Sequence, residues 1–268
     1  MSSRNTYISD LHGHSIYSDG YSKPTKIVDA AVKNGLNIIA LTDHNTTLGL
    51  LEFDQRLKEV NQNEPKIIGI YGIEVSTQKG HVIFLFHDID VANEFGRYIK
   101  HEKEGNDFKK TILLSKNYDC FMIFAHPEVP NIHSVKFEDI SDFVKEFGED
   151  FGKFGVEQIN AISRLVFPKF QLKKHLDLGR FIGNIEHEIK LFGNTDYHSP
   201  SGVGLGVTVF ETEQEIVSSK DFIHFLKHSN VFGEPKINRR LSLLYHAKVV
   251  LDSTIGQTRY QFKQFKSV

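Results

Sequence analysis

Histidine and carboxylate side chains recur along this chain at the ends of predicted strands, and they are the residues that could carry chemistry. They lie in five short stretches, which read ISDLHGHSIYSDG, NIIALTDHNTT, YGIEVSTQKGH, FMIFAHPEV and FGNTDYHSP. The candidates are His12, His14, Asp19, His44, Glu74, His81, His126, Asp196 and His198. Nitrogen and oxygen donors of this kind bind divalent cations, and so many donors exceed the needs of one ion. The set therefore predicts a site for several metal ions, and metal-assisted hydrolysis is the reaction that it favours.

Two pairs of these donors are separated by a single residue. Side chains at positions i and i+2 of an extended strand point the same way, so His12 and His14 can bind one cation together. Asp196 and His198 repeat this spacing. A lone pair of histidines is more often an ordinary surface or core pair. The recurrence of donors at later strand ends outweighs that interpretation here.

Glu74 could connect two ions, because the two oxygens of one carboxylate can bind different metals. Such a bridge holds the ions about 3.5–4 Å apart, the separation typical of two-metal hydrolysis. His81 follows Gly80 on the same side of a predicted turn as Glu74. We therefore prefer His81 to His87 as a further ligand.

Short apolar runs alternate with longer helical stretches, and these elements must position the donors. The expected strands are Thr6–Leu11, Leu36–Thr42, Lys66–Glu74, His81–Phe86, Phe121–Ala125, Gly155–Ile159 and Leu191–Asn194. The expected helices are Pro24–Asn34, Leu48–Asn61, Val91–Lys116 with a break near Gly105, Phe137–Phe147, Phe170–Leu178 and Asp221–His228. Repeated strand–helix units predict a parallel sheet that closes into a barrel. Active sites of such barrels gather at the C-terminal ends of the strands, where this pattern places the donors.

The pattern changes after Pro235, where Leu241–Leu251 and Gln257–Phe265 suggest a hairpin or an edge pair. We expect a barrel domain over residues 1–235 and a C-terminal extension over residues 236–268 that packs on it. A length of 268 residues suits one large α/β domain better than two small ones.

Composition excludes several classes of protein. The net charge of -2 gives no general affinity for nucleic acid or for an acidic membrane. No apolar run approaches the roughly 20 residues that span a bilayer, and the first residues do not form an apolar signal segment. Cys120, the single cysteine, lies in an apolar run and is expected to be a buried thiol. We expect a cytoplasmic protein that does not bind membranes.

The chain resembles the polymerase and histidinol phosphatase (PHP) superfamily. The stretches that match are DLHGHSIYSDG, IIALTDHNT, GIEVST, GHVIFLF, FAHP and NTDYHS, which follow the order of the family. The resemblance implies a distorted (β/α)7 TIM-like barrel with a trinuclear metal site. It also implies three ligand sets, which are His12, His14, Glu74 and Asp196 for one ion, Glu74, His81 and His126 for another, and Asp19, His44 and His198 for the third. NTDYH stands where GSDAH is commoner, so we expect Tyr197 to narrow the mouth of the site.

These observations predict a metal-dependent phosphoesterase that hydrolyses phosphomonoesters of the nucleotide, sugar phosphate or histidinol phosphate type through a metal-bound hydroxide. It would use two to three ions of Mn, Fe or Zn. Glu74, Asp196 and His198 are the expected catalytic residues. Arg164 follows the predicted strand in GVEQINAIS and is the expected substrate-binding residue, because a guanidinium can bind phosphate at two points.

Two other functions stay open. The first is a metal-dependent exonuclease acting at the 5′ or 3′ end of short nucleic acids. Its bases would need aromatic partners, for which the candidates are Tyr17, Tyr21, Phe167 and Tyr197. The second is a non-catalytic interaction module that is stabilised by its metals. Modules of that kind tend to lose ligands, whereas here every expected ligand is present.

Overall fold

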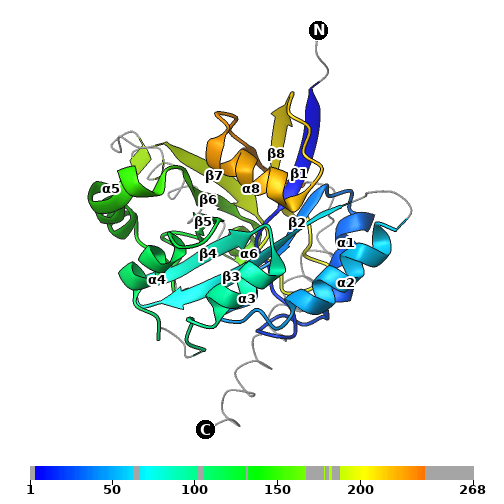
Figure 1. Ribbon diagram of the computed structural model, residues 1–268, viewed down its shortest axis with the longest axis horizontal. Coiled ribbons are helices and arrows are strands. Elements are labelled where there is room, and N and C mark those ends of the chain that lie inside the picture. The colour runs from blue at the N-terminus through cyan, green and yellow to red at the C-terminus, as the bar shows by residue number, and fades with distance from the viewer. Residues whose placement is uncertain are drawn as a thin grey trace.

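The computed structural model describes residues 4–62, 67–101, 105–130, 132–166, 178, 181–182 and 188–238. Its strands are β1 (Asn5–Asp10), β2 (Ile38–Leu41), β3 (Ile68–Thr77), β4 (Gly80–Phe86), β5 (Cys120–Phe124), β6 (Phe154–Asn160), β7 (Ile189–Asn194), β8 (Gly206–Thr212) and β9 (Glu234–Ile237). Its helices are α1 (Pro24–Lys33), α2 (Leu50–Val60), α3 (Ile89–Gly96), α4 (Phe108–Ser115), α5 (Phe137–Phe151), α6 (Ala161–Val166) and α8 (Ser219–His228). Helices cover the outer side of one curved sheet (Figure 1).

The strands form one mixed sheet in the order β7-β6-β5-β4-β3-β2-β1-β8-β9. The sheet curls until β7 lies beside β8, where the hydroxyl of Thr208 accepts from the Gly193 amide at 2.9 Å and donates to the Gly193 carbonyl at 3.0 Å. Gly206 permits this approach, because a Cβ there would lie 2.1 Å from the carbonyl oxygen of Asn194. The prediction of a barrel is confirmed, since the sheet is nearly closed.

The sheet is not wholly parallel, which differs from the expectation of repeated parallel units. β4 runs antiparallel to both β3 and β5, and β8 runs antiparallel to β1. For β4 the cause is the two-residue turn Gln78–Lys79, because a hairpin of this length can join only antiparallel strands. Gly80 closes the turn with a φ of +133°, a conformation that favours glycine.

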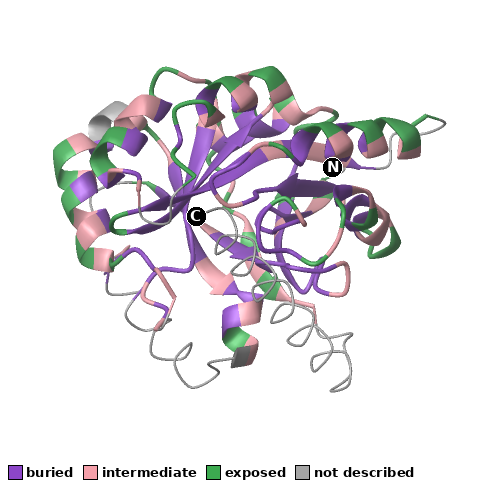
Figure 2. Cartoon of the chain, turned by 90° about the horizontal axis from the view of Figure 1, so that it is seen from below, coloured by how far each residue is buried: buried purple, intermediate pink, exposed green. Residues whose placement is uncertain are grey.

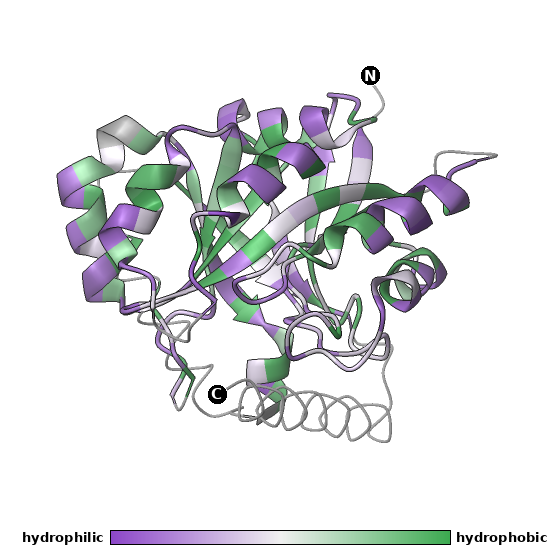
Figure 3. Cartoon of the chain, turned by 60° about the horizontal axis from the view of Figure 1, so that its bottom comes forward, coloured by the Kyte–Doolittle hydropathy of each residue, from purple (hydrophilic) through white to green (hydrophobic). Residues whose placement is uncertain are grey.

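Residues of each central strand alternate between two apolar layers. On β4, Val82, Phe84 and Phe86 pack under the outer helices. Ile83 and Leu85 instead join an inner cluster that also contains the apolar face of α8. Figure 2 shows the strands buried over most of their length, and Figure 3 shows hydrophilic residues on the outer sides of the helices. The alternation is the period of two that a strand buried on both faces requires.

α8 closes the end of the barrel that lies opposite the start of β4. The hydroxyl of Ser219 at the start of α8 donates to the carbonyl oxygen of His87, which directly follows β4, at 2.8 Å. His87 and His81 therefore lie at opposite ends of the barrel. This separation is why His87 cannot join donors that gather around His81.

Some expected elements differ from the observed ones. The helix expected over Val91–Lys116 is two helices, because Asp88 caps α3 and Asp107 caps α4 through their side chains. Strands β8 and β9 and helix α6 were not expected. The helix expected over Phe170–Leu178 and the segments Leu241–Leu251 and Gln257–Phe265 lie largely or wholly outside the described residues.

β9 ends at Ile237, so nearly all of the expected extension over residues 236–268 also lies outside the described residues, and this division of the chain stays a prediction. Among the helices that the structure describes, none has the length and apolar character needed to cross a bilayer.

Candidate metal centre

The predicted donors converge at one end of the barrel from six strands. His12 and His14 follow β1, His44 follows β2, and a bridge pairs His44 with Glu74 of β3. His81 lies at the start of β4, which reaches the same end because β4 runs antiparallel. Asp19 lies in the loop between β1 and α1, His126 follows β5, and Asp196 and His198 follow β7.

Glu74 lies at the centre of this cluster and is fully buried. Its Oε1 lies 3.2 Å from His12 Nε2, 3.1 Å from His81 Nδ1 and 3.2 Å from His126 Nε2. Its Oε2 lies 3.2 Å from His14 Nε2 and 3.0 Å from His44 Nδ1. The two oxygens of one carboxylate thus face two separate groups of imidazoles.

Asp196 and Asp19 complete the cluster on either side of His14. Asp196 Oδ1 lies 3.6 Å from His12 Nε2 and 3.2 Å from His14 Nε2. Asp19 Oδ2 lies 3.1 Å from His198 Nε2 and 3.7 Å from His44 Nε2. Asp196 therefore shares His12 and His14 with Glu74. Asp19 shares His44 with Glu74 and extends the cluster to His198.

The donor atoms do not satisfy one another by hydrogen bonding, and metal ions would satisfy them better. Several buried donor atoms have no hydrogen-bond partner within the described part of the chain, namely His12 Nε2, both ring nitrogens of His14, Asp19 Oδ1, His44 Nδ1, Glu74 Oε2 and His81 Nδ1. A buried polar atom without a partner costs about 1–3 kcal/mol, so a cluster of them needs a compensating ligand.

The donors form four overlapping groups that could each hold an ion. Within each group, the ligand atoms all lie within 4.8 Å of one another. These groups are His12–Glu74–His126, His12–His14–Asp196, His14–Asp19–His198 and His14–His44–Glu74. The residues present fit a multinuclear centre of divalent ions.

The charges in the cluster shift the pKa values of its members, so metal binding is linked to the release of protons. Burial disfavours the charged form of Glu74, but the neighbouring imidazoles, His12 first, outweigh it and hold the Glu74 pKa well below its ordinary value. Burial also opposes a charge on His14, yet Asp19 and the other carboxylates raise the His14 pKa to about 10. Burial lowers the pKa of His44 to about 3. Without metal, carboxylates therefore share the site with a protonated His14.

Arg164 lies outside the donor cluster, on α6, and its side chain is exposed. α6 begins directly after β6, and its Ile162 amide donates to the Thr195 carbonyl at 3.1 Å, next to Asp196. Arg164 is thus carried by an element at the end of the barrel where the donors lie. Its contact with a substrate stays a prediction.

Tyr197 does not narrow the mouth of the site, so that expectation was wrong. Its side chain is fully buried, and its hydroxyl donates to the carbonyl oxygen of Ala40. Its ring lies against Gly13, where a Cβ would come within 2.3 Å of ring carbons. The ring can lie there because a glycine separates the two histidines that follow β1. Of the other aromatic candidates, Phe167 lies outside the described residues, while Tyr17 and Tyr21 are exposed.

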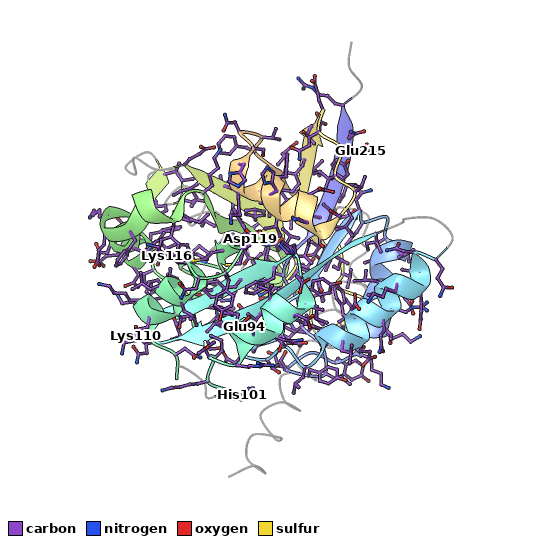
Figure 4. The ribbon with its side chains drawn as sticks, viewed as in Figure 1. Glu94, His101, Lys110, Lys116, Asp119 and Glu215 are labelled. Atoms are coloured by element: carbon purple, nitrogen blue, oxygen red, sulfur yellow. The ribbon has the colours of Figure 1, made fainter. Side chains whose placement is uncertain are left out.

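Buried acids next to the donors were missed in the sequence. Asp43 accepts from the Ser15 amide at 2.7 Å and from the Ser18 hydroxyl at 2.6 Å, which fixes the loop that leads to Asp19. Glu157, in the middle of β6, contacts His12. The signal of Glu157 was a charged residue inside a predicted strand, and that of Asp43 was its position directly before the candidate ligand His44. By contrast, Figure 4 shows charged side chains such as Glu94 and Lys110 on the outer helices, where they are exposed.

Comparison with known proteins identifies a family whose pattern this chain matches. The sequence pattern of the PHP domain family matches residues 10–157. A 5'-3' exoribonuclease of Haemophilus influenzae is 44% identical over 68 residues, which is 25% of this chain and 23% of that protein. A 3',5'-nucleoside bisphosphate phosphatase of Chromobacterium violaceum is 49% identical over 43 residues, which is 16% of this chain and 15% of that protein. The matched segments thus span less than a quarter of either curated relative.

The fold is also similar to a solved structure. A two-domain protein of Bacteroides vulgatus, described as containing a predicted PHP-like metal-dependent phosphoesterase, aligns with a TM-score of 0.61 and 20% sequence identity. The alignment covers 92% of this chain and 70% of that one. This likeness supports the distorted barrel.

Metal binding should strengthen as pH rises. The raised pKa of His14 means that an ion must displace a proton at neutral pH, so affinity should rise between about pH 6 and 9, by up to about tenfold per pH unit for each displaced proton. Calorimetric titration of chelator-treated protein with Mn²⁺ across this range measures the slope. His87→Gln, at the opposite end of the barrel, should leave the slope unchanged. An affinity that does not vary with pH would contradict this coupling.

Proposed function

The chain belongs to the PHP domain family, and we propose that it is a metal-dependent phosphoesterase that hydrolyses phosphomonoesters. The observation that carries the proposal is the buried Glu74 carboxylate, whose two oxygens face separate groups of imidazoles at 3.0–3.2 Å. A carboxylate in this position suits a bridge between two ions. Two-metal sites of this kind serve hydrolysis of phosphate esters.

We assign the ligands in three sets. His12, His14, Glu74 and Asp196 would hold one ion, Glu74, His81 and His126 a second, and Asp19, His44 and His198 a third. The close approach of Asp19 to His198, at 3.1 Å, supports the third set. The donors suit Mn, Fe or Zn, because imidazole and carboxylate serve all three. When bound, two or three such ions would activate a water molecule and neutralise charge on the phosphoryl oxygens.

Neighbouring groups fix the atoms through which Asp196 and His198 act. Asn160 donates to Asp196 Oδ2 at 3.1 Å, which leaves Oδ1 directed at His12 and His14. His198 Nδ1 lies 2.9 Å from the backbone carbonyl of Asp196. A carbonyl can only accept, so Nδ1 carries the proton and Nε2 is the atom available in the site. Nε2 is thus the atom that would bind the third ion, and only without that ion could it give a proton to a leaving oxygen.

Arg164 would hold the phosphate of the substrate. Its guanidinium is exposed on α6, which begins at the end of the barrel where the donors lie. A guanidinium can form two parallel hydrogen bonds with phosphate oxygens. The nucleoside bisphosphate phosphatase among the relatives supports a small phosphorylated substrate.

An exonuclease is the second candidate, and the similarity to a 5'-3' exoribonuclease favours it. Tyr17 and Tyr21 flank Asp19 and are 39% and 38% exposed, so they are available for stacking on bases. The net charge of -2 gives no support for strong nucleic-acid binding. We rank a non-catalytic module last, because no donor of the set is missing.

Glu74→Gln should abolish hydrolysis and retain the fold. The amide cannot bind two cations with two anionic oxygens, so at least one ion should be lost. Elemental analysis should find two to three equivalents in the native protein and fewer in the variant, while circular dichroism stays unchanged. The native protein should release phosphate from an aryl phosphate, and EDTA should stop this. A native protein with under one metal per chain, or a fully active variant, would refute the proposal.

Arg164→Gln should raise KM for a phosphomonoester about tenfold or more, because one charge-assisted contact with the phosphate is lost. Its metal content should not change. Arg97→Gln, which removes an exposed arginine just after α3, is the matched control and should leave KM unchanged. The measurement is KM from steady-state kinetics of the native protein and both variants at equal metal content. Equal KM values for the two variants would remove Arg164 from the substrate site.

A substrate screen separates the two enzymatic candidates. Nucleotides, sugar phosphates and 5′- or 3′-labelled short oligonucleotides are incubated with the Mn²⁺-loaded protein, with Glu74→Gln as the blank. We expect phosphate release from monomers and no shortening of the oligonucleotides. Stepwise shortening without phosphate release would assign the exonuclease instead.

A further inference from the structure

Glu157 is a fully buried acid of β6 that lies outside the predicted ligand set. Its Oε1 lies 2.8 Å from His12 Nδ1 and accepts from Asn194 Nδ2 at 2.9 Å. Its Oε2 accepts from the His126 backbone amide at 2.8 Å and from Asn160 Nδ2 at 3.2 Å. One carboxylate thus joins residues carried by, or directly following, four strands of the barrel.

The chemistry of these partners fixes the tautomer of His12. Three of the four partners are N–H groups that can only donate, and a carboxylate can only accept. His12 Nδ1 must therefore carry a proton, which it donates to Glu157. The other ring nitrogen, Nε2, lies 3.2 Å from Glu74 Oε1 and is the atom from which a cation would displace a proton. This is the tautomer that can bind a cation through Nε2.

The same carboxylate holds the backbone at His126. The φ of His126 is +30°, a region that a residue with a Cβ rarely occupies. The hydrogen bond from its amide to Glu157 Oε2 stabilises this conformation, which turns the imidazole toward Glu74, 3.2 Å away. Asn160 extends the effect, because it donates both to Glu157 and to Asp196 Oδ2.

We propose that Glu157 is a positioning residue that presents His12 to the first ion and His126 to the second. The proposal rests on the metal-binding part of the proposed function. Its effect should be local. None of Asp19, His44 and His198, the set assigned to the third ion, is among the hydrogen-bond partners of Glu157, so that ion should be less affected.

Glu157→Gln tests the role with almost no change in volume. A carboxamide has one oxygen, so it places its NH₂ group against either the Asn194 and His12 side or the His126 and Asn160 side, where donors already point at it. If the NH₂ group faces His12, the proton of His12 moves to Nε2 and blocks that ligand atom. Loss of such a contact typically weakens metal binding about 10- to 100-fold.

The measurement is a Mn²⁺ titration of chelator-treated protein, followed by calorimetry and by elemental analysis after dialysis. Glu157→Gln should lose one or two equivalents, or bind them about 10- to 100-fold more weakly, and retain the remaining one. Asp54→Asn is the matched control, because it neutralises a buried acid on α2 whose partners are the Tyr71 hydroxyl, at 2.6 Å, and the Lys58 ammonium, at 2.7 Å. It should lower the melting temperature and leave the titration unchanged.

The outcomes separate this inference from the proposed function. A native protein that binds no metal refutes the proposed function. A native protein that binds metal, with Glu157→Gln binding equally well, refutes only the role of Glu157. Uniform loss of all equivalents, shared by Asp54→Asn, would show a structural role alone and also refute it.

A second measurement uses the native protein and does not depend on how a variant folds. Nitrogen NMR of the imidazoles in the Zn²⁺-loaded protein, with the His12 signals assigned by their loss in His12→Gln, reports the tautomer. We expect a protonated Nδ1 and a metal-bound Nε2 on His12. A deprotonated Nδ1 would overturn the inference.

Discussion

The burial of several ionisable groups around one carboxylate is the constraint on which the rest of this structure depends. Glu74 is removed from solvent, with five imidazole nitrogens within 3.2 Å of its oxygens. Charges taken out of water are tolerated only where opposite charges and hydrogen bonds compensate. Protons can compensate in part, but several donor atoms have no partner among the described residues, so imidazole–carboxylate pairing does not satisfy the cluster. Divalent ions would satisfy both the charges and the lone pairs.

The fold meets this constraint by bringing the start of the antiparallel strand β4 to the same end of the barrel as the ends of its neighbouring strands. The reversal of β4 brings His81 level with Ser76 and near Glu74, where a parallel strand would have placed His87 instead. Two donors lie in the left-handed region, with φ values of +30° at His126 and +62° at Asp196. Strain of this kind costs about 1–3 kcal/mol at each residue and persists only where neighbours enforce it. Here the Glu157 carboxylate holds the amide of His126, and the His12 carbonyl accepts from the amide of Asp196 at 3.0 Å.

The sequence predicted the donors well because ligand chemistry limits them to a few residue types at strand ends. The spacing of one intervening residue identifies two pairs directly, His12 with His14 and Asp196 with His198. Glu157 and Asp43 did not, because they act on other residues, and their partners become visible only when distant strands meet. Tyr197 was misjudged for a related reason, since nothing local shows that its ring packs against Gly13. The barrel followed from alternating apolar runs, whereas β8 and β9 and the direction of β4 depend on pairings that the local pattern does not encode.

The proposed function requires that these donors form a single cage for several cations. The most direct test is anomalous X-ray diffraction from crystals of the protein grown with Mn²⁺ or Zn²⁺. We predict anomalous peaks on both sides of the Glu74 carboxylate, each within bonding distance of imidazole nitrogens from the cluster. Peaks confined to surface residues, or an ordered cluster with no peak beside Glu74 at saturating metal, would contradict the claim.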